Sequence, residues 1–276
     1  MSIMGYRKVH IVMPGLEVIR VTKPLRHIGC ERLIIFGDPD KNDSKVRIYY
    51  EYNEEIKHQL KDLLKGEEIT HVDVDLYDFE AILSNLCRII KEEKERKNLV
   101  FVNVSCGSKI FVAAAVMASM MYGAVPYFSR RIGFRTKTKD FEENGRPAGI
   151  AKDTDDPVEI PTFELKPPEP VLIVILSAIK DLREKHKIVR QGDIIKGLHD
   201  KGIMDDVYEV EKPSSKKQTV LGIPKVSRHA LNQFKTQYFN KMVENGWVAT
   251  KGYGRRVEVH LTERGEQMLR IFCHLR

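Results

Sequence analysis

Residues 99–116 read LVFVNVSCGSKIFVAAAV, a pattern that predicts a buried strand, a tight polar turn and a buried helix in direct succession. Leu99 to Val104 is a largely apolar run without alternation, which is typical of a parallel strand covered on both faces. The residues after Lys109 are so apolar that they predict a buried helix. A strand that turns directly into a helix leaves unpaired backbone N–H groups, which bind phosphate or another anion readily. The alternative is an ordinary turn in which a serine caps the helix.

Further short apolar runs predict additional strands, and helical patterns separate them. These strands are expected at Val9–Met13, Leu33–Gly37, Ile69–Leu76 and Val125–Ser129. Helices are expected after the first strand, over Tyr52–Leu64 and after Asp78, which is a good N-cap. Strands that alternate with helices in this way predict an α/β protein with a Rossmann-like, doubly wound parallel sheet.

The predicted strand order, 3-2-1-4-5, places the reversal of winding between the first and fourth strands, where ligands bind beyond the carboxyl ends. We therefore expect the loop after the first strand and the turn after the fourth to share one ligand-binding cleft. The candidate ligand-binding residues are Pro14, Gly15, Leu16, Glu17, Asn103, Ser105, Cys106, Gly107, Ser108 and Lys109. The polar stretch 140–157 has no clear periodicity, and the sequence leaves open whether it is a lid or a partner arm.

A proline-rich segment divides the chain. Pro167, Pro168 and Pro170 form a stiff linker, so residues 166–170 are expected to separate a domain of residues 1–165 from one of residues 171–276. Residues 1–167 hold 26 Lys and Arg against 26 Asp and Glu, and residues 168–276 hold 20 against 13, so the net charge of +7 lies in the second part. Such a distribution is typical of a nucleic-acid-binding module attached to a neutral domain. A basic surface that only serves solubility is the alternative.

The C-terminal region has the pattern of a winged helix-turn-helix: helices, a basic-tipped hairpin and a closing helix. Its third helix is expected to begin at Ser227 and to bury Leu231, Phe234, Tyr238 and Met242. The opposite face of that helix suits base contacts in the major groove, and the hairpin tip suits phosphate contacts. The candidate DNA-binding residues are Ser227, Arg228, Asn232, Lys235, Thr236, Lys251, Tyr253, Arg255 and Arg256. The connection over 202–225 is longer than a usual helix-turn-helix turn, and a helical bundle with a basic face is the alternative.

The segment Asn103-Val104-Ser105-Cys106-Gly107-Ser108-Lys109 is neither a Walker loop nor a dinucleotide fingerprint. It resembles the second signature of the CARF domain, the CRISPR-associated Rossmann fold, in which a strand, a polar turn with glycine and a Lys or Arg opening a helix follow one another. With this motif, the strand spacing and the winged-helix pattern taken together, the chain resembles the archaeal CARF transcriptional regulators over most of its length. The resemblance implies a homodimer, linked to antiviral defence, that binds a cyclic oligoadenylate, foremost cyclic tetra-adenylate, and double-stranded DNA.

Some CARF proteins cleave their own cyclic nucleotide, so a ring nuclease with Lys109 stabilising the departing phosphate is the alternative function. No general base is visible in either loop, and we predict no catalytic residue. The cysteines are scattered without a zinc spacing, which predicts a reduced, cytoplasmic protein without metal or cofactor. Ile110–Phe128 carries no formal charge, but Gly123 and Pro126 divide it into lengths typical of soluble proteins, so no membrane association is expected.

Overall fold

The structure is a computed structural model, in which the chain divides into two compact units, Met1–Pro167 and Pro168–Arg276. The structure describes residues 6–37, 44–64, 68–135, 142–143, 146–186, 188–205, 207–208, 225–252 and 257–276. The first unit is built on a six-stranded sheet with the order β10-β5-β4-β1-β2-β3. Its strands are β1 (Lys8–Val12), β2 (Arg32–Gly37), β3 (Ile69–Asp73), β4 (Leu99–Asn103), β5 (Val125–Phe128) and β10 (Val158–Glu159).

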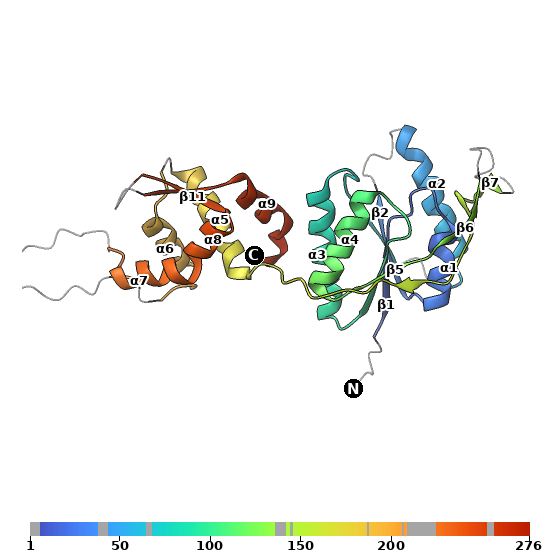
Figure 1. Ribbon diagram of the computed structural model, residues 1–276, viewed down its shortest axis with the longest axis horizontal. Helices are drawn as coiled ribbons and strands as arrows, with labels where there is room; N and C mark the ends of the chain where they lie inside the picture. Colours follow the sequence, from blue (N-terminus) through green and yellow to red (C-terminus); the bar gives the residue numbers. More distant parts are fainter. Residues whose placement is uncertain are drawn as a thin grey trace, which may run out of the picture. The chain divides into compact units, whose positions relative to one another are not determined.

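The parallel core of this sheet confirms the predicted topology. β1 pairs in parallel with both β2 and β4, and β3 and β5 extend the sheet on either side in the order 3-2-1-4-5. Val9, Ile11 and Val12 of the central strand are fully buried, because helices cover both faces. α1 and α2 lie on one face, and α3 and α4 on the other (Figure 1).

In the part of the chain that the structure describes, four helices flank this sheet, and capping residues mark the start of α3 and the end of α4. The helices are α1 (Ile19–Ile28), α2 (Ser44–Gln59), α3 (Phe79–Glu95) and α4 (Lys109–Tyr122). Asp78 caps α3 as predicted, since its side chain accepts a hydrogen bond from the Ala81 N–H at 3.0 Å. α4 ends at Gly123, whose φ of 70° lies in the left-handed region that a glycine adopts without steric cost.

Two predicted elements have different bounds in the structure. α2 covers Ser44–Gln59, so it begins before Tyr52 and ends before Leu64, the predicted bounds. Tyr52, Ile56 and Leu60 are buried at the expected helical spacing. β3 ends at Asp73 and not at Leu76, because its pairing with β2 stops at the pair Gly37–Asp73, where β2 ends.

The stretch after β5 forms an antiparallel arm, which the sequence did not predict. Its strands are β6 (Arg131–Phe134), β7 (Glu142–Glu143), β8 (Arg146–Pro147) and β9 (Ala151–Thr154). β6 pairs with β9, and the chain then returns to the sheet, where β10 pairs antiparallel with β5. Every residue of β6 is exposed, so its sequence carries no alternation of buried and exposed positions.

The second unit has the helices and the hairpin of a winged helix. Its elements are α5 (Pro170–Lys185), α6 (Gln191–Asp200), α7 (Arg228–Phe234), η3 (Lys235–Phe239), α8 (Asn240–Glu244), β11 (Val248–Lys251), β12 (Glu258–Leu261), α9 (Glu263–Ile271) and the short η5 (Cys273–Leu275). β11 and β12 form the expected antiparallel hairpin. The segment before α6 pairs with β12 of this hairpin. Arg190 forms an isolated antiparallel bridge with Glu258, and the Val259 N–H donates to the Val189 carbonyl at 2.8 Å.

The third helix begins as predicted and then departs from the predicted register. Ser227 caps it by accepting from the Ala230 N–H at 3.1 Å. Residues 235–239 make a π-helical turn, which inserts one residue into the helical repeat. Phe239 therefore faces the core in place of the predicted Tyr238, which is half-buried. Phe234 and Met242 are fully buried as expected.

Candidate functional site

A cavity of about 540 Å³ lies in the first unit at the carboxyl ends of β1 to β4. Parallel α/β sheets bind ligands at this edge where the strand order reverses, here between β1 and β4. The volume is in the range of small-molecule sites. Lining it are Met13, Pro14, Gly15, Leu16, Glu17, Arg20, Phe36, Gly37, Tyr49, Tyr50, Asn53, His71, Asp73, Leu76, Tyr77, Ser105, Cys106, Gly107, Ser108 and Ile150.

The loop after β1 and the turn after β4 meet in this cavity, as the sequence predicted, and two glycines allow the approach. Gly15 and Gly107 have φ angles of 59° and 88°, in the left-handed region. A Cβ on Gly107 would lie 3.1 Å from the carbonyl oxygen and side chain of Met13, and one on Gly15 would lie 3.9 Å from the Gly107 nitrogen. The two loops thus approach so closely that a larger residue at 107 would push them apart.

The turn after β4 presents backbone donors. Ser108 caps α4, with its Oγ accepting from the Phe111 N–H at 3.1 Å. The N–H groups of Gly107 and Ser108 donate no hydrogen bond to any residue that the structure describes. They lie at the positive end of a helix dipole and beside the cavity, which is where an anion is stabilised. The capping serine and the anion site are therefore compatible, because they use different groups of the same turn.

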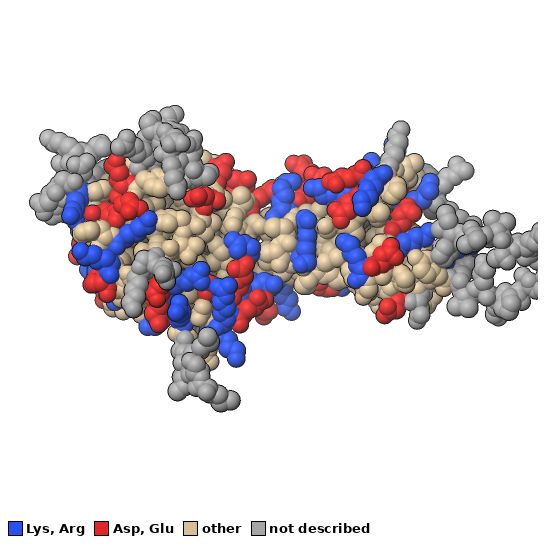
Figure 2. Space-filling view, turned by 180° about the vertical axis from the view of Figure 1, so that it is seen from behind, with Lys and Arg blue, Asp and Glu red and all other residues tan. Residues whose placement is uncertain are grey.

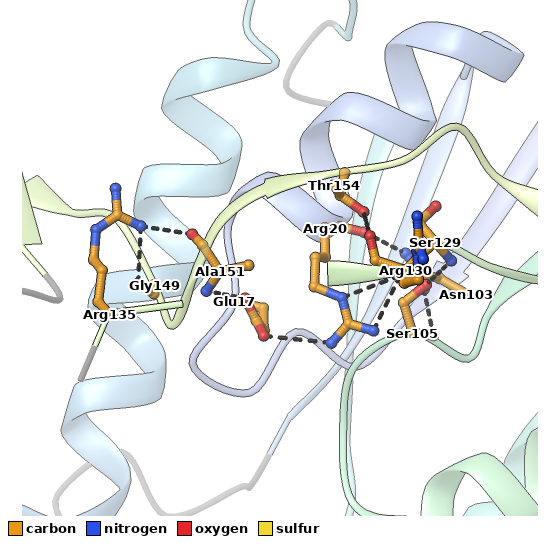
Figure 3. A network of polar contacts seen from close by, with 10 residues as sticks. All are labelled: Glu17, Arg20, Asn103, Ser105, Ser129, Arg130, Arg135, Gly149, Ala151 and Thr154. Carbon is orange, nitrogen blue, oxygen red and sulfur yellow. Dashed lines mark hydrogen bonds and ion pairs between the residues drawn. The ribbon is translucent and has the colours of Figure 1, made fainter. Parts of the chain in front are cut away.

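A buried polar network holds these loops in place (Figure 3). Arg20 donates from Nε and Nη2 to the Ser129 carbonyl at 3.2 and 3.1 Å, and from Nη1 to Glu17 at 3.4 Å. The Ser129 N–H donates to Ser105 Oγ at 2.7 Å. Asn103 donates to the Arg20 carbonyl at 2.9 Å and accepts from the Ser105 N–H at 2.8 Å. The loops after β1, β4 and β5 are thereby fixed to one another without a ligand.

The arm completes the same network from the far side of the loop after β1. The Ala151 N–H donates to Glu17 Oε2 at 3.0 Å, and the Ile150 N–H donates to the Leu16 carbonyl at 3.1 Å. Gly149 has a φ of 90°, and a Cβ there would lie 3.0 Å from the Leu16 oxygen. Arg135 donates to the carbonyls of Gly149 and Ala151. The stretch whose role was left open thus supplies a wall of the cavity.

The candidate ligand-binding residues occupy different positions relative to the cavity. Pro14 to Glu17 and Ser105 to Ser108 line it, whereas Asn103 and Lys109 are absent from its lining. Asn103 is buried and bonded to backbone, and Lys109 is exposed at the start of α4. Burial raises the pKa of the Cys106 thiol to about 12, so this group stays protonated and is a poor nucleophile at neutral pH.

The part of the cavity at the ends of β2 and β3 was not predicted from the sequence. Aromatic and polar side chains gather there: Tyr49, Tyr50, Asn53, His71, Asp73 and Tyr77. Asn53 sits on α2, one residue after the buried Tyr52, so in the sequence it looked like a polar residue at the edge of an apolar stripe. Its burial is decided by how α2 packs over the end of β2, which no local pattern reports.

Of the candidate DNA-binding residues that are described, all are exposed except Ser227, which is half-buried and caps α7. Arg228, Asn232, Lys235 and Thr236 project from α7 and η3, and Lys251 ends β11. The Thr236 hydroxyl donates to the Asn232 carbonyl at 2.9 Å, so it is already used within the helix. Tyr253, Arg255 and Arg256 lie outside the described residues. On the face of the molecule shown in Figure 2, Lys and Arg are interspersed with Asp and Glu.

The residues that the structure describes contain neither a candidate metal site nor a candidate membrane span. No group of three or more His, Cys, Asp and Glu among those residues is arranged to hold a metal ion. No helix in that part of the chain is both long and apolar enough to cross a membrane.

Two family models match this chain, one within each of its two compact units. Residues 8–131 match the family model described as "HFX_2341_N:-like, N-terminal". Residues 172–273 match the model of the DUF6293 C-terminal winged helix domain. The uncharacterized protein MJ1513 of Methanocaldococcus jannaschii is 26% identical over 129 residues, which are 44% of this chain and 37% of that protein. The chain thus matches little more than a third of the curated relative.

Solved structures give weaker likenesses. Enterococcus italicus Csm6 bound to cyclic hexa-2′-fluoro-hexa-dAMP has a TM-score of 0.42 at 12% identity, over 70% of this chain and 50% of that one. Can2 from Sulfobacillus thermosulfidooxidans in complex with cyclic tetra-adenylate has a TM-score of 0.35 at 11% identity, and the match covers 97% of this chain and 64% of that one. Protein VC1899 from Vibrio cholerae has a TM-score of 0.33 at 14% identity, and the match covers 97% of this chain and 65% of that one. Scores of this size carry no argument about function.

The strand order of the first unit and the family match of the second lead to one conclusion about architecture. This chain joins a Rossmann-like α/β unit to a C-terminal winged-helix domain.

Proposed function

We propose that the first unit is a CARF-type sensor that binds a cyclic oligoadenylate, foremost cyclic tetra-adenylate, and that the second unit binds double-stranded DNA. The protein would then be a ligand-responsive transcriptional regulator linked to CRISPR defence, acting as a cytoplasmic homodimer. One observation carries the proposal. A single cavity at the switch point of the sheet combines free backbone donors of a glycine turn with a wall of aromatic side chains.

Each half of that cavity suits one half of a nucleotide. Backbone N–H groups at the start of a helix stabilise a phosphate, and the Gly107 and Ser108 N–H groups have this placement. Aromatic side chains offer faces on which a base stacks, and Tyr49 and Tyr77 line the same cavity. Lys109 stands at the first position of α4, outside the cavity lining, where it would meet the phosphate of a ligand larger than one nucleotide.

The decisive experiment is a calorimetric titration with cyclic tri-, tetra- and hexa-adenylate. We expect binding of one of these rings, with one ligand per two chains if the site lies on a dimer axis. The Lys109→Ala variant should bind more weakly by about 1.5–3 kcal/mol, the usual worth of a hydrogen bond to a charged group. Lys61→Ala, which removes another exposed lysine of the same unit, is the control and should bind as the native protein does. Unaltered affinity in Lys109→Ala would remove this residue from the site.

The regulatory role requires that the ligand change DNA binding. DNA affinity should be measured by fluorescence anisotropy with and without saturating ligand, and a coupling of about 1–3 kcal/mol is typical of such systems. Linkage demands that DNA change ligand affinity by the same factor. Equal DNA affinities in the two conditions would leave a sensor without a regulatory output.

Cleavage of the ring is the competing function. Chromatography of the ligand after incubation with the protein would detect linear products. Neither Cys106 nor Glu17 favours it, because burial keeps the Cys106 thiol protonated and the Glu17 carboxylate is bonded to Arg20 and Ala151. Rapid accumulation of linear products would replace the sensor with a ring nuclease.

A further inference from the structure

Asn53 has a largely buried side chain whose amide has no partner among the residues that the structure describes. Only 6% of it is exposed, and it lines the cavity from α2. Its carboxamide makes no hydrogen bond with any residue that the structure describes, and nothing else in those ranges contacts it electrostatically. Most buried polar groups in proteins are hydrogen-bonded, and a polar group that stays unpaired at the wall of a cavity is accessible to a ligand there. Such a group at the wall of a cavity indicates a polar partner that binds there.

The position of the carboxamide can be stated from its neighbours. A Cβ built on Gly37, the last residue of β2, lies 3.9 Å from Asn53 Nδ2. Gly37 is paired in register with Asp73, the last residue of β3. Asp73 also lines the cavity, is exposed, and has no hydrogen-bond or ionic partner among the described residues. The amide and the carboxylate therefore share the corner of the cavity at the ends of β2 and β3.

The hydrogen-bonding capacity of this corner is specific. An ionised carboxylate only accepts hydrogen bonds, whereas a carboxamide accepts through its oxygen and donates through its nitrogen. Together they match a planar group that offers two N–H donors beside one acceptor. The 6-amino group and an adjacent ring nitrogen of adenine have this arrangement, and asparagine reads adenine in this bidentate way in nucleic acids. Tyr49 and Tyr77 in the same wall supply faces for stacking.

We propose that Asn53 and Asp73 form the base-recognition subsite of this cavity and select adenine by its exocyclic amine. The subsite rests on the proposed function, because it assigns the base end of the same ligand. Asn53 Oδ1 accepts one amine proton, Asn53 Nδ2 donates to the ring nitrogen, and Asp73 accepts the second amine proton. An oxygen at position 6, as in hypoxanthine, meets the Asp73 carboxylate with a lone pair in place of a proton and is rejected.

The test compares cyclic tetra-adenylate with cyclic tetra-inosinate, which differs in replacing the amine by an oxygen. Titration calorimetry should show that the native protein prefers the adenine ring by roughly 5- to 100-fold, the discrimination typical of one well-placed bidentate contact. Asn53→Leu and Asp73→Asn should each bring the ratio of the two affinities close to one. Asn85→Leu on α3 is the matched control and should keep the native ratio, because the bonds that Asn85 makes with described residues, to Ala81 and Arg88, stay within that helix.

The outcomes separate the two proposals. If the native protein binds no cyclic oligoadenylate, the proposed function falls and the subsite falls with it. If it binds the adenine ring but both variants keep the native ratio, or lose affinity for the two rings equally, only the subsite is overturned. If Asn53→Leu fails to fold, the exposed Asp73→Asn decides, because replacing an exposed carboxylate by an isosteric amide leaves the packing intact.

Discussion

The carboxylate of Glu17 accepts a hydrogen bond from the backbone N–H of Ala151 at 3.0 Å, across 134 residues of sequence. The same carboxylate pairs with Arg20 at 3.4 Å, and both side chains are buried. Glu17 was a candidate ligand residue in the sequence, yet both of its oxygens are bonded within the protein. Its clear role is to hold the arm against the loop after β1, which shapes one wall of the cavity.

Removing this carboxylate should destabilise the first unit. Glu17→Ala leaves Arg20 buried without its counter-charge and the Ala151 N–H unbonded, and breaking a buried pair in this way costs about 3–5 kcal/mol. Glu17→Gln keeps an acceptor for Ala151 and should cost less. Urea denaturation followed by circular dichroism measures both. Glu54→Ala, which breaks the exposed pair with Lys57, should cost less than about 1 kcal/mol. A Glu17→Ala variant as stable as Glu54→Ala would contradict the role given to the buried pair.

His10 should make stability depend on pH. Its Nε2 lies 3.0 Å from the Gly29 carbonyl and its Nδ1 lies 3.2 Å from the Tyr127 hydroxyl, and burial lowers its pKa from 6.5 to about 4. Between those values the unfolded chain binds a proton that the folded chain does not. Stability is therefore complete above about pH 6.5 and falls as the pH decreases toward 4, by at most about 3 kcal/mol.

The pH profile of the free energy of unfolding measures this dependence. His10→Gln should flatten the profile between pH 4 and 6.5, at the cost of lower stability at neutral pH. His229→Gln, at an exposed position on α7, should leave the native slope in place. An unchanged slope in His10→Gln would show that other groups produce the dependence.

Gly265 should be indispensable to the second unit. It packs so tightly under the hairpin that a Cβ there would collide with the carbonyl oxygen of Trp247. Gly265→Ala forces α9 away from the hairpin and should destabilise the unit by about 1–3 kcal/mol or more. Gly197→Ala is the matched control, since nothing lies within 4 Å of its Cβ and alanine favours a helix by about 1 kcal/mol. Trp247 is the only tryptophan, so its fluorescence in urea follows this unit alone. Equal midpoints for the two variants would contradict the close contact.

The exposed basic residues of the second unit should affect DNA binding in two different ways. Arg228→Ala should weaken binding by about 1–3 kcal/mol on a preferred sequence and little on others, if this side chain contacts a base edge. Lys251→Ala should weaken binding to all duplexes alike and reduce the slope of log affinity against log salt by about one. Anisotropy titrations at several salt concentrations measure both effects. A flat salt dependence of the native protein would indicate a protein partner in place of DNA.

The order of the parallel strands in the first unit and the helix–hairpin pattern of the second were predictable from short stretches of sequence. Buried parallel strands are continuous apolar runs, and caps such as Asp78 and Ser227 bond to backbone a few residues away, so short stretches carry these signals. The meeting of the loop after β1 with the turn after β4 also followed from the sequence, because strand order alone brings them to one edge.

The tertiary structure alone decided which side chains line the cavity. The burial of Asn53 depends on how α2 crosses the end of β2, and the bond between Glu17 and Ala151 depends on an arm whose strand β6 is exposed and has no periodic signal. The π turn at Lys235–Phe239 likewise exchanges Tyr238 for Phe239 in the core without altering the apolar pattern. These features arise from contacts between segments far apart in sequence, or from a one-residue change in helical repeat, and local composition reports neither.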